Sequence, residues 1–500
     1  MNDNSKKMSL FSAVLVGATS MVGSGWLFSA QLTARNAGNW AFLAWILAAI
    51  LILMIALCLG KVVSMYPVRG ATTRSSAISH NNVFAMPFAF ANWFGVVVVI
   101  SSEALATTQY LAGVKSMDWL MTDGDLTLAG TAFALFILVV YLFINFYGVK
   151  FLAKINNGIT VFKMVVPVLI VIIFVAYAIT HSSDHVSMFA DDIPGNSQFG
   201  FHSALTAIVG GGLIYTFNGF QTVVSYASEV KNPGRNVPLA IFIALVLVLC
   251  LYLGLQYAFM QAVPHDYLVQ KGGWAGLDFE SPLLQLAMML GLGYISVLLI
   301  VDSIVSPSAT GYIYLGASSR MLYAMSAEGQ VPRFFAKITP KVNISRRSLV
   351  ANFLLSGFFL LFSNNWTALM LVVTGFHIIG YMAAPISMGA LAPRTRIFGL
   401  VVFVILTLLL NTVEIETNVH MSAILIILMT IYGSLEYRRI GLRSLLPLVL
   451  PFIIFIAIVS PIDHYVFEGF VGAIFYWFVT DKRYIAFCKK TANDKNIIVD

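Results

Sequence analysis

Long apolar segments, separated by short polar stretches, follow one another along almost the whole chain. A helix that crosses a bilayer needs about 20 predominantly apolar residues. On that criterion the sequence predicts fourteen spans, with twelve as the alternative count because Pro451 and Pro461 interrupt or flank the last, short segments. The predicted spans are residues 10–33, 41–65, 86–114, 126–147, 158–180, 205–227, 237–262, 287–318, 347–363, 367–391, 397–412, 419–436, 444–460 and 465–480.

The first span is interrupted near its middle by Gly23-Ser24-Gly25. Glycine inside a helix costs ~1 kcal/mol relative to alanine, and a backbone group freed within hydrocarbon needs a partner in protein or beside a water-filled cavity. A second interruption, rich in glycine, lies at residues 210–220. Two interrupted spans, one opening each half, predict the broken helices of a secondary transporter. We therefore expect an all-α polytopic fold with a five-plus-five inverted-repeat core, although the halves share no residue-level similarity.

Composition supports a membrane protein, because 59% of the residues are hydrophobic and only 10% are charged, against about 25% charged in soluble chains. With the N-terminus inside, only Arg35, Lys115 and Lys271 of all the lysines and arginines fall on outside loops, as the positive-inside rule predicts. The net charge of +7 thus reflects topology and does not indicate nucleic-acid binding. We expect a multi-pass protein of the cell membrane, in contact with lipid, with both termini in the cytoplasm.

Other classes of function lack their sequence signals. The three cysteines, Cys58, Cys250 and Cys488, are too far apart for a disulfide framework or a metal site. The sequence contains no nucleotide-binding loop, nucleophile elbow or metal-ligand spacing, and no selectivity-filter motif. We therefore expect neither an enzyme nor a cofactor-binding protein nor a channel.

Three ionisable side chains lie well inside predicted spans: Glu103, Lys163 and Asp302. Such groups cost roughly 2.5–3.5 kcal/mol on insertion and are functional hypotheses by default. Burial disfavours the charged form, which suits a group that exchanges protons. The alternatives are a structural hydrogen bond for each carboxylate and, for the lysine near the end of its span, snorkelling to the surface. His377 is expected to be a core histidine, and Gln221 to lie near the second break.

Several motifs resemble those of the amino acid-polyamine-organocation (APC) superfamily of permeases, over about residues 10–395. They are Gly23-Ser24-Gly25 with Phe28, Glu229 with Asn232-Pro233, Arg235 and Pro238, and Arg320 with Tyr323-Ala324-Met325, Glu328-Gly329, Pro332 and Phe335. Within the superfamily, the chain looks closest to the aspartate/proton symporter-like branch. That likeness rests on residues 23–28, Glu103-Ala104 with Gln109-Tyr110, and Asp302 with Ser306-Pro307-Ser308 and Thr310-Gly311.

The resemblance implies that backbone donors at the first break bind the carboxylate of an amino acid and that carbonyls at the second bind its ammonium. N–H groups at a helix N-terminus do form anion sites; the alternative is that the glycines only permit close helix packing. Tyr215 resembles an aromatic gate, with a packed core tyrosine as its alternative, and Tyr314 is a weaker candidate. The candidate substrate-binding residues are Val22, Gly23, Ser24, Gly25, Tyr215, Thr216, Phe217, Asn218, Gly219 and Tyr314.

By the same resemblance, Lys163 takes the place of a sodium ion beside Ser306, Ser308 or Thr310. The candidate proton-coupling residues are Lys163, Glu103, Asp302, Ser306 and Thr310. We expect proton-coupled amino acid symport by alternating access. The branch favours an acidic amino acid, although no arginine lies in the predicted cavity. The alternatives are amino acid/product exchange and transport of a polyamine or another amino acid class.

The expected organisation follows from the spans. Residues 1–9 form a cytoplasmic tail, residues 10–395 the transporter core, residues 396–480 accessory spans, and residues 481–500 a second cytoplasmic tail.

Overall fold

The computed structural model describes residues 7–66, 71–146, 149–181, 193–227, 230–339, 345–363, 365–462 and 464–493. Glu229, residue 147 at the end of a predicted span, and residues 1–6 and 494–500 of the predicted tails lie outside this part of the chain.

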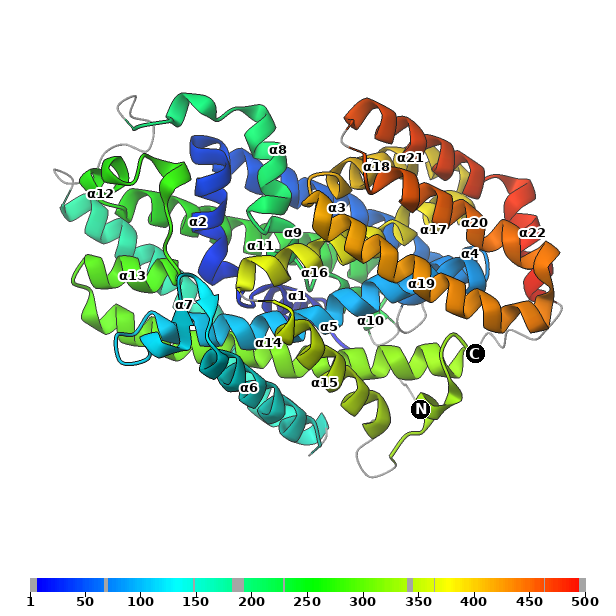
Figure 1. The fold of residues 1–500 in the computed structure, drawn as a ribbon, viewed down its shortest axis with the longest axis horizontal. Coiled ribbons are helices and arrows are strands. Elements are labelled where there is room, and N and C mark those ends of the chain that lie inside the picture. The colour runs from blue at the N-terminus through cyan, green and yellow to red at the C-terminus, as the bar shows by residue number, and fades with distance from the viewer. Residues whose placement is uncertain are drawn as a thin grey trace.

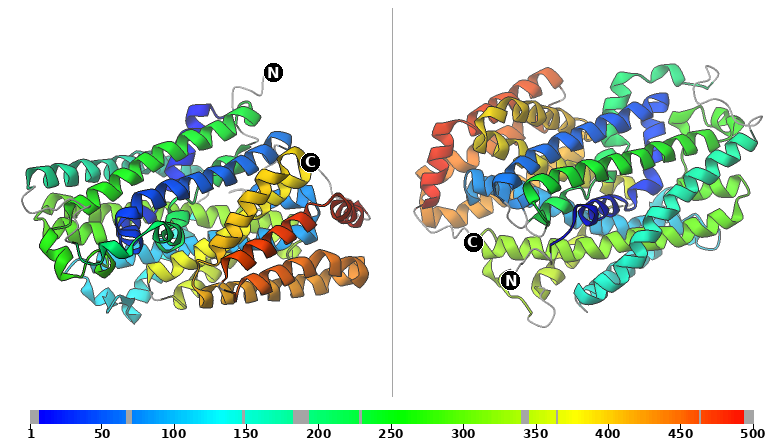
Figure 2. Two further views of the ribbon diagram at one scale, coloured as in Figure 1. Left: turned by 90° about the horizontal axis from the view of Figure 1, so that it is seen from above. Right: turned by 180° about the vertical axis from the view of Figure 1, so that it is seen from behind.

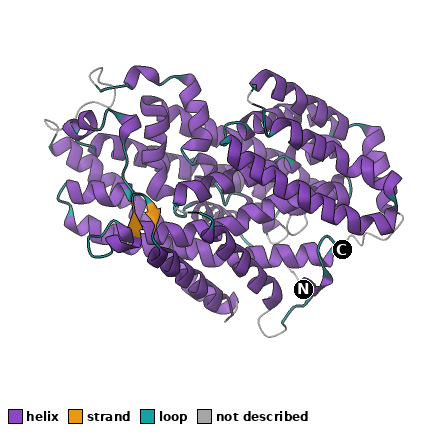
Figure 3. Ribbon diagram, in the orientation of Figure 1, coloured by secondary structure: helices purple, strands orange, loops and turns teal. Residues whose placement is uncertain are grey.

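The described chain is almost entirely helical (Figures 1 and 3). Within it, the one small sheet is an antiparallel hairpin of β1 (Met121–Thr122) and β2 (Asp125–Leu126), with Met121 opposite Leu126. The predicted all-α polytopic class is therefore confirmed.

In the predicted core region, the described residues form the helices α1 to α17. They are α1 (Leu10–Met21), α2 (Gly25–Ala37), α3 (Ala41–Met65), α4 (Ala71–Ser79), α5 (Asn82–Ala112), α6 (Leu128–Phe146), α7 (Val149–Thr180), α8 (Phe201–Gly210), α9 (Leu213–Thr216), α10 (Gln221–Ser225), α11 (Pro233–Ala262), α12 (His265–Gln270), α13 (Pro282–Met289), α14 (Gly293–Ala327), α15 (Arg346–Leu361), α16 (Trp366–Tyr381) and α17 (Ala383–Leu391). The helices that follow are α18 (Arg396–Leu410), α19 (Ile415–Ile440), α20 (Leu442–Val459), α21 (Tyr465–Val479) and α22 (Lys482–Asn493).

Ten helical stretches in the described residues are long and apolar enough to cross a membrane. One of these stretches, Gly25–Met65, contains both α2 and α3, and three shorter apolar helices are α1, α8 and α21. Each of the fourteen predicted spans coincides with a helix or with a broken helix. The chain is thus a multi-pass membrane protein.

Helix α5 forms the centre of the fold. Every residue from Val83 to Ala112 is buried, because α4, α6, α14, α15 and α16 all pack against it. Apolar character on every side of a helix is typical of such a position. Any polar side chain on α5, including Glu103, must therefore find its partners on other helices.

The two broken helices lie side by side. Helix α2 packs against α8 and α9, and α1 packs against α10 and α11. In the right view of Figure 2 the short first helix, dark blue, lies beside the long green helix α11, against which it packs. The breaks predicted far apart in sequence therefore meet in the interior.

Helices α18 to α22 gather at one side of the molecule, gold to red in Figure 1. They contact the preceding helices through α18 on α17 and through α19 and α20 on α5. Within this group, the buried carboxylate of Glu468 accepts hydrogen bonds from Asn411 Nδ2 at 2.6 Å and from the His464 backbone N–H at 3.0 Å.

Several short helices outside the apolar segments were not predicted, among them α4, α12 and α22. Helix α22 lies in the predicted tail 481–500. It buries Tyr484 and Cys488 and exposes its lysines and arginine. Asn81 Nδ2, at the start of α5, donates to the Cys488 carbonyl at 2.9 Å. This part of the tail is therefore a docked amphipathic helix.

Candidate functional site

The first break spans three residues between α1 and α2. Helix α1 ends at Met21, Val22 is extended at φ −89° and ψ 90°, and α2 begins at Gly25. A β-carbon added to Gly25 would lie 2.8 Å from Thr216 Oγ1 and 3.1 Å from Thr216 Cα. Glycine at this position lets the two broken helices touch.

The second break consists of two interruptions with a short helix between them. Helix α8 ends at Gly210, Gly212 has φ +72°, and α9 is only four residues long. Gly219 has φ +118°, and a β-carbon there would collide with the Ser20 carbonyl at the end of α1. The predicted break at residues 210–220 is confirmed as a stretch of irregular backbone, and it lies directly against the first break.

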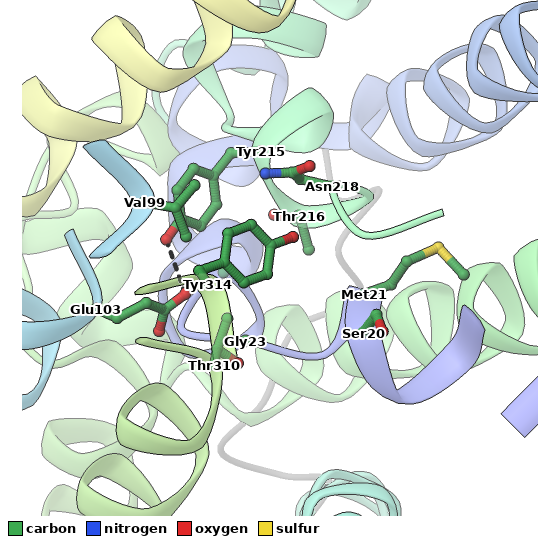
Figure 4. Close-up of a pocket in the computed structure, with 11 residues that line it drawn as sticks. Ser20, Met21, Gly23, Val99, Glu103, Tyr215, Thr216, Asn218, Thr310 and Tyr314 are labelled. Carbon is green, nitrogen blue, oxygen red and sulfur yellow. Dashed lines mark hydrogen bonds between the residues drawn. The ribbon is translucent and has the colours of Figure 1, made fainter. Parts of the chain in front are cut away.

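Glu103 joins the first break to the centre of the fold. The Ser24 backbone N–H donates to both carboxylate oxygens, at 3.0 Å to Oε2 and 3.3 Å to Oε1. The Tyr215 hydroxyl also donates to Oε1, at 3.0 Å (Figure 4). Anions are favoured at such a site because the N–H groups at the start of α2 are not bonded within their helix. The carboxylate therefore occupies an anion site made by the break.

Tyr215 lies over this carboxylate. Its hydroxyl shares hydrogen bonds with Ser24 Oγ at 2.9 Å and Ser102 Oγ at 2.8 Å. Its ring packs edge-on against Trp366, with centroids 5.1 Å apart. Trp366 Nε1 in turn donates to Ser24 Oγ at 3.0 Å. Tyr215, on α9, thus connects the first break to α5 and α16.

The three ionisable residues predicted inside spans converge on the same region from α5, α7 and α14. Lys163 Nζ donates to Thr310 Oγ1 at 2.8 Å, Thr310 Oγ1 donates to the Ser306 carbonyl at 3.2 Å, and Ser306 Oγ donates to Asp302 Oδ1 at 2.7 Å. Lys163 interacts electrostatically with both Glu103 and Asp302. All three are at most 4% exposed. The lysine amine therefore points into the protein rather than toward its surface.

A small cavity lies where the two breaks meet (Figure 4). Its lining residues are Ser20, Met21, Gly23, Gly25, Val99, Glu103, Tyr215, Thr216, Asn218, Thr310 and Tyr314. Its free volume of ≈ 10 Å³ is no more than a single water molecule requires. The structure is closed, so side chains must move before a solute the size of an amino acid can enter.

Not every candidate residue lines this cavity. The Phe217 ring packs in the core against Trp45 and Tyr252, at centroid distances of 5.7 and 5.6 Å. Asp302 and Ser306 lie outside the lining and connect to it through Thr310. The Tyr141 hydroxyl contacts Ser308 Oγ at 3.4 Å.

Two other polar side chains singled out in the sequence are Gln221, which lies beside the cavity lining, and His377, which lies between helices. Gln221 Nε2 donates to Asn218 Oδ1 at 2.6 Å, which places it beside the lining. His377 Nδ1 contacts the Val373 carbonyl at 2.9 Å, and its ring lies against Gly95 of α5. His377 therefore belongs to the helix packing, as the sequence predicted.

Sequence reasoning missed several residues of the site. Ser20 and Met21 directly precede the first break, and that position is a signal that could have identified them. Val99 lies one helical turn before Glu103 on α5 and therefore on the same face. No sequence feature pointed to Trp366, because its contact with Ser24 depends on the packing of helices that are far apart in the sequence.

Two discontinuous helices that meet at a closed, polar cavity within a polytopic bundle are the architecture of a membrane transporter. Sequence comparison agrees, since a profile of the amino acid permease family matches residues 8–435. The chain therefore belongs to the amino acid permease family of the APC superfamily, as its motifs indicated.

Three characterised relatives come from Bacillus subtilis strain 168. The chain is 34% identical to the glutamate/serine transporter AimA over 399 residues, covering 78% of this chain and 72% of that protein. It is 33% identical to an aspartate-proton symporter over 393 residues, covering 78% and 74%. It is also 24% identical to a methylthioribose transporter over 403 residues, covering 78% and 79%.

Proposed function

We propose that this protein is a secondary active transporter that takes up a small amino acid together with a proton by alternating access. The observation that carries the proposal is the meeting of both broken helices at one closed cavity, beside a buried lysine and two buried carboxylates. The family and the two relatives at 33–34% identity support an amino acid as the cargo.

The first break offers complementary ends to an amino acid. The N-terminus of α2 carries a partial positive charge and suits the α-carboxylate, whereas the C-terminal end of α1 carries a partial negative charge and suits the α-ammonium. Met21, at that end of α1, and Thr216, at the end of α9, both line the cavity. We therefore assign the main-chain groups of the substrate to backbone on both sides of the break.

The rest of the lining favours a small substrate side chain. Its side-chain polar groups include Ser20, Asn218 and Thr310, and Lys163 contacts Thr310 from outside the lining. No arginine is among the described lining residues. A serine-like side chain could be bound by the hydroxyl and amide groups, and an acidic side chain would need Lys163. Serine, aspartate and glutamate are thus the first substrates to test.

Charge balance favours coupling to protons. Glu103, Asp302 and Lys163 carry a net charge of −1 when all three are ionised, and an uncompensated charge inside a membrane protein is costly. One added proton makes the group neutral. The Lys163 ammonium already provides a cation at Thr310, where a sodium-coupled transporter would need hydroxyl oxygens as ligands.

Uptake into liposomes tests this function. We expect the purified protein to accumulate labelled L-serine, L-glutamate or L-aspartate in sodium-free buffer when the outside is acidic, and a protonophore to abolish accumulation. Lys163→Ala should reduce accumulation at least tenfold and remove its response to pH, because the buried cation is lost. Lys61→Ala is the matched control, since Lys61 is exposed on α3.

Three results would contradict parts of the proposal. Accumulation that requires sodium would exclude proton coupling. Uptake only into liposomes preloaded with an amino acid would indicate an exchanger. A Lys163→Ala protein with the wild-type pH profile would show that Lys163 does not take part in coupling.

A further inference from the structure

We infer that Glu103 is a built-in competitor of the substrate: its carboxylate occupies the place of the substrate's α-carboxylate and leaves that place only when it takes up a proton. This inference rests on the proposed function and identifies the step at which proton and substrate are coupled.

The contacts of Glu103 are those expected of a bound carboxylate ligand. Both oxygens accept from the Ser24 N–H, at 3.0 and 3.3 Å, and Oε1 also accepts from the Tyr215 hydroxyl at 3.0 Å. A β-carbon on Gly23 would lie 2.8 Å from Oε1, so the carboxylate rests directly on the backbone of the break. A second carboxylate cannot reach the Ser24 N–H while Glu103 is there.

The closed cavity leads to the same conclusion. Its free volume of ≈ 10 Å³ is that of about one water molecule, and Glu103 and Tyr215 are part of its wall. A substrate carboxylate at the start of α2 must therefore replace the Glu103 carboxylate and separate it from Tyr215.

The charged and titratable groups around Glu103 make an ionised Glu103 incompatible with a second carboxylate. Lys163 of α7 attracts it, and Asp302 of α14 interacts with the same lysine. The tyrosines that interact electrostatically with Glu103 are Tyr141 of α6, Tyr215 of α9, Tyr252 of α11 and Tyr314 of α14. His377 of α16 lies against Gly95, eight residues and so about 12 Å along α5 from Glu103.

Among these groups only Lys163 is a cation close to the site, and two carboxylates already share it. Two carboxylates that share one anion site do not both stay ionised. When the substrate enters, a proton from the external solution therefore adds to a Glu103 oxygen, and the α-carboxylate takes over the Ser24 N–H. When the substrate leaves on the other side, Glu103 releases the proton and returns to Ser24. No covalent bond of the substrate changes, and the anion site holds one negative charge before and after.

Equilibrium binding to the purified protein tests this exchange. The probes are labelled L-serine, L-glutamate and L-aspartate, measured between pH 5 and 8. For the wild type we expect the affinity of the bound amino acid to fall by about tenfold per pH unit in the alkaline part of this range, as uptake of one proton per substrate requires. In Glu103→Gln, which keeps the size but cannot ionise, binding at pH 8 should reach at least the wild-type level at pH 5, without a pH slope.

Glu468→Gln is the matched control, because Glu468 is also a fully buried glutamate in an apolar helix; it should keep the wild-type slope. A Glu103→Gln protein that retains the slope overturns the inference. So does one that elutes as a folded protein but has lost binding at every pH, because Glu103 would then help to hold the substrate.

A measurement on the wild type alone covers the case in which Glu103→Gln does not fold. Adding L-serine, L-glutamate or L-aspartate to the protein in weak buffer at pH 7.5 should remove close to one proton from solution per bound molecule, as a pH indicator would report. Binding without proton uptake overturns the inference and leaves amino acid transport intact. If the wild type and Glu468→Gln bind none of these amino acids, the proposed function itself is wrong.

Discussion

Two buried glutamates, Glu103 on α5 and Glu468 on α21, use the same chemistry in different contexts. Each carboxylate accepts a hydrogen bond from a backbone N–H at the start of a helix, from Ser24 before α2 and from His464 before α21. Glu468 lies four residues from His464 and caps its own helix, whereas Glu103 lies 79 residues from Ser24 and caps a different one.

This difference distinguishes a structural carboxylate from one that is able to switch. A local cap remains in place whenever its helix forms. A cap supplied by another helix breaks whenever the two helices separate, as they would in the alternating-access cycle proposed above. Glu103 also shares its surroundings with Lys163 and Asp302, whereas Glu468 accepts hydrogen bonds from an amide side chain and a backbone N–H. The predictions below test whether transport depends on the surroundings of Glu103 and not on those of Glu468.

The largest effect is expected from Gly25→Leu. The added side chain would meet the backbone of Thr216, 3.1 Å from the new β-carbon, and would cover the donors at the start of α2. Uptake should fall at least a hundredfold in the liposome assay, while the amount of protein in the membrane stays at the wild-type level.

Gly293→Leu is the control for this substitution. Gly293 starts α14, and a β-carbon added there would have nothing within 4 Å, so uptake by this variant should be unchanged. Wild-type binding of L-serine, L-glutamate or L-aspartate by Gly25→Leu would mean that the break is only a packing contact.

The contrast between the two glutamates also shows what a sequence can predict. The spans follow from the apolar runs, and both breaks follow from glycines inside such runs, because these signals are local. The partner of Glu103 is not local, and neither is the contact between Trp366 and Ser24. Phe217 was assigned to the site because it lies in the second break, but its ring packs against Trp45 and Tyr252 in the core. Glycines within apolar runs located the broken segments, and only packing determined which side chains face the cavity.

Helix α22 was missed for a different reason. Its polar and apolar residues alternate with a helical period outside any apolar run, so it has no spanning signal. Its buried contacts to Asn81 and Pro447 come from segments far away in sequence.

A smaller effect is expected from Tyr215→Ala. The substitution removes the ring that packs on Trp366 and the hydroxyl that bonds to Glu103. Since an aromatic pair contributes ~0.5–1.5 kcal/mol beyond its buried area, loss of the ring that covers the site should raise the Michaelis constant by roughly two- to tenfold, and preloaded amino acid should leak from liposomes faster. Tyr257→Ala, at an exposed tyrosine of α11, should change neither. Unchanged affinity and leak in Tyr215→Ala would leave Tyr215 as a core residue with no gating role.

The smallest effect is expected where His80, between α4 and α5, meets α21. His80 Nε2 contacts the Val479 carbonyl at 2.8 Å and Nδ1 contacts Ser79 Oγ at 2.8 Å. Burial lowers the pKa of His80 from its ordinary 6.5 to about 4. Between these values the unfolded chain binds a proton that the folded protein does not, so stability is fully present above pH 6.5 and is lost as the pH falls toward 4.

The expected loss is at most ~3 kcal/mol in the free energy of unfolding. His80→Gln should therefore lose less thermal stability than the wild type between pH 7 and 5, whereas His420→Gln, at an exposed histidine, should follow the wild type. Both variants should keep the wild-type pH dependence of substrate binding, because His80 is remote from the cavity lining. A changed binding profile in His80→Gln would show that protonation beside α21 acts on the cavity. The region of Glu468 would then not be independent of the region of Glu103.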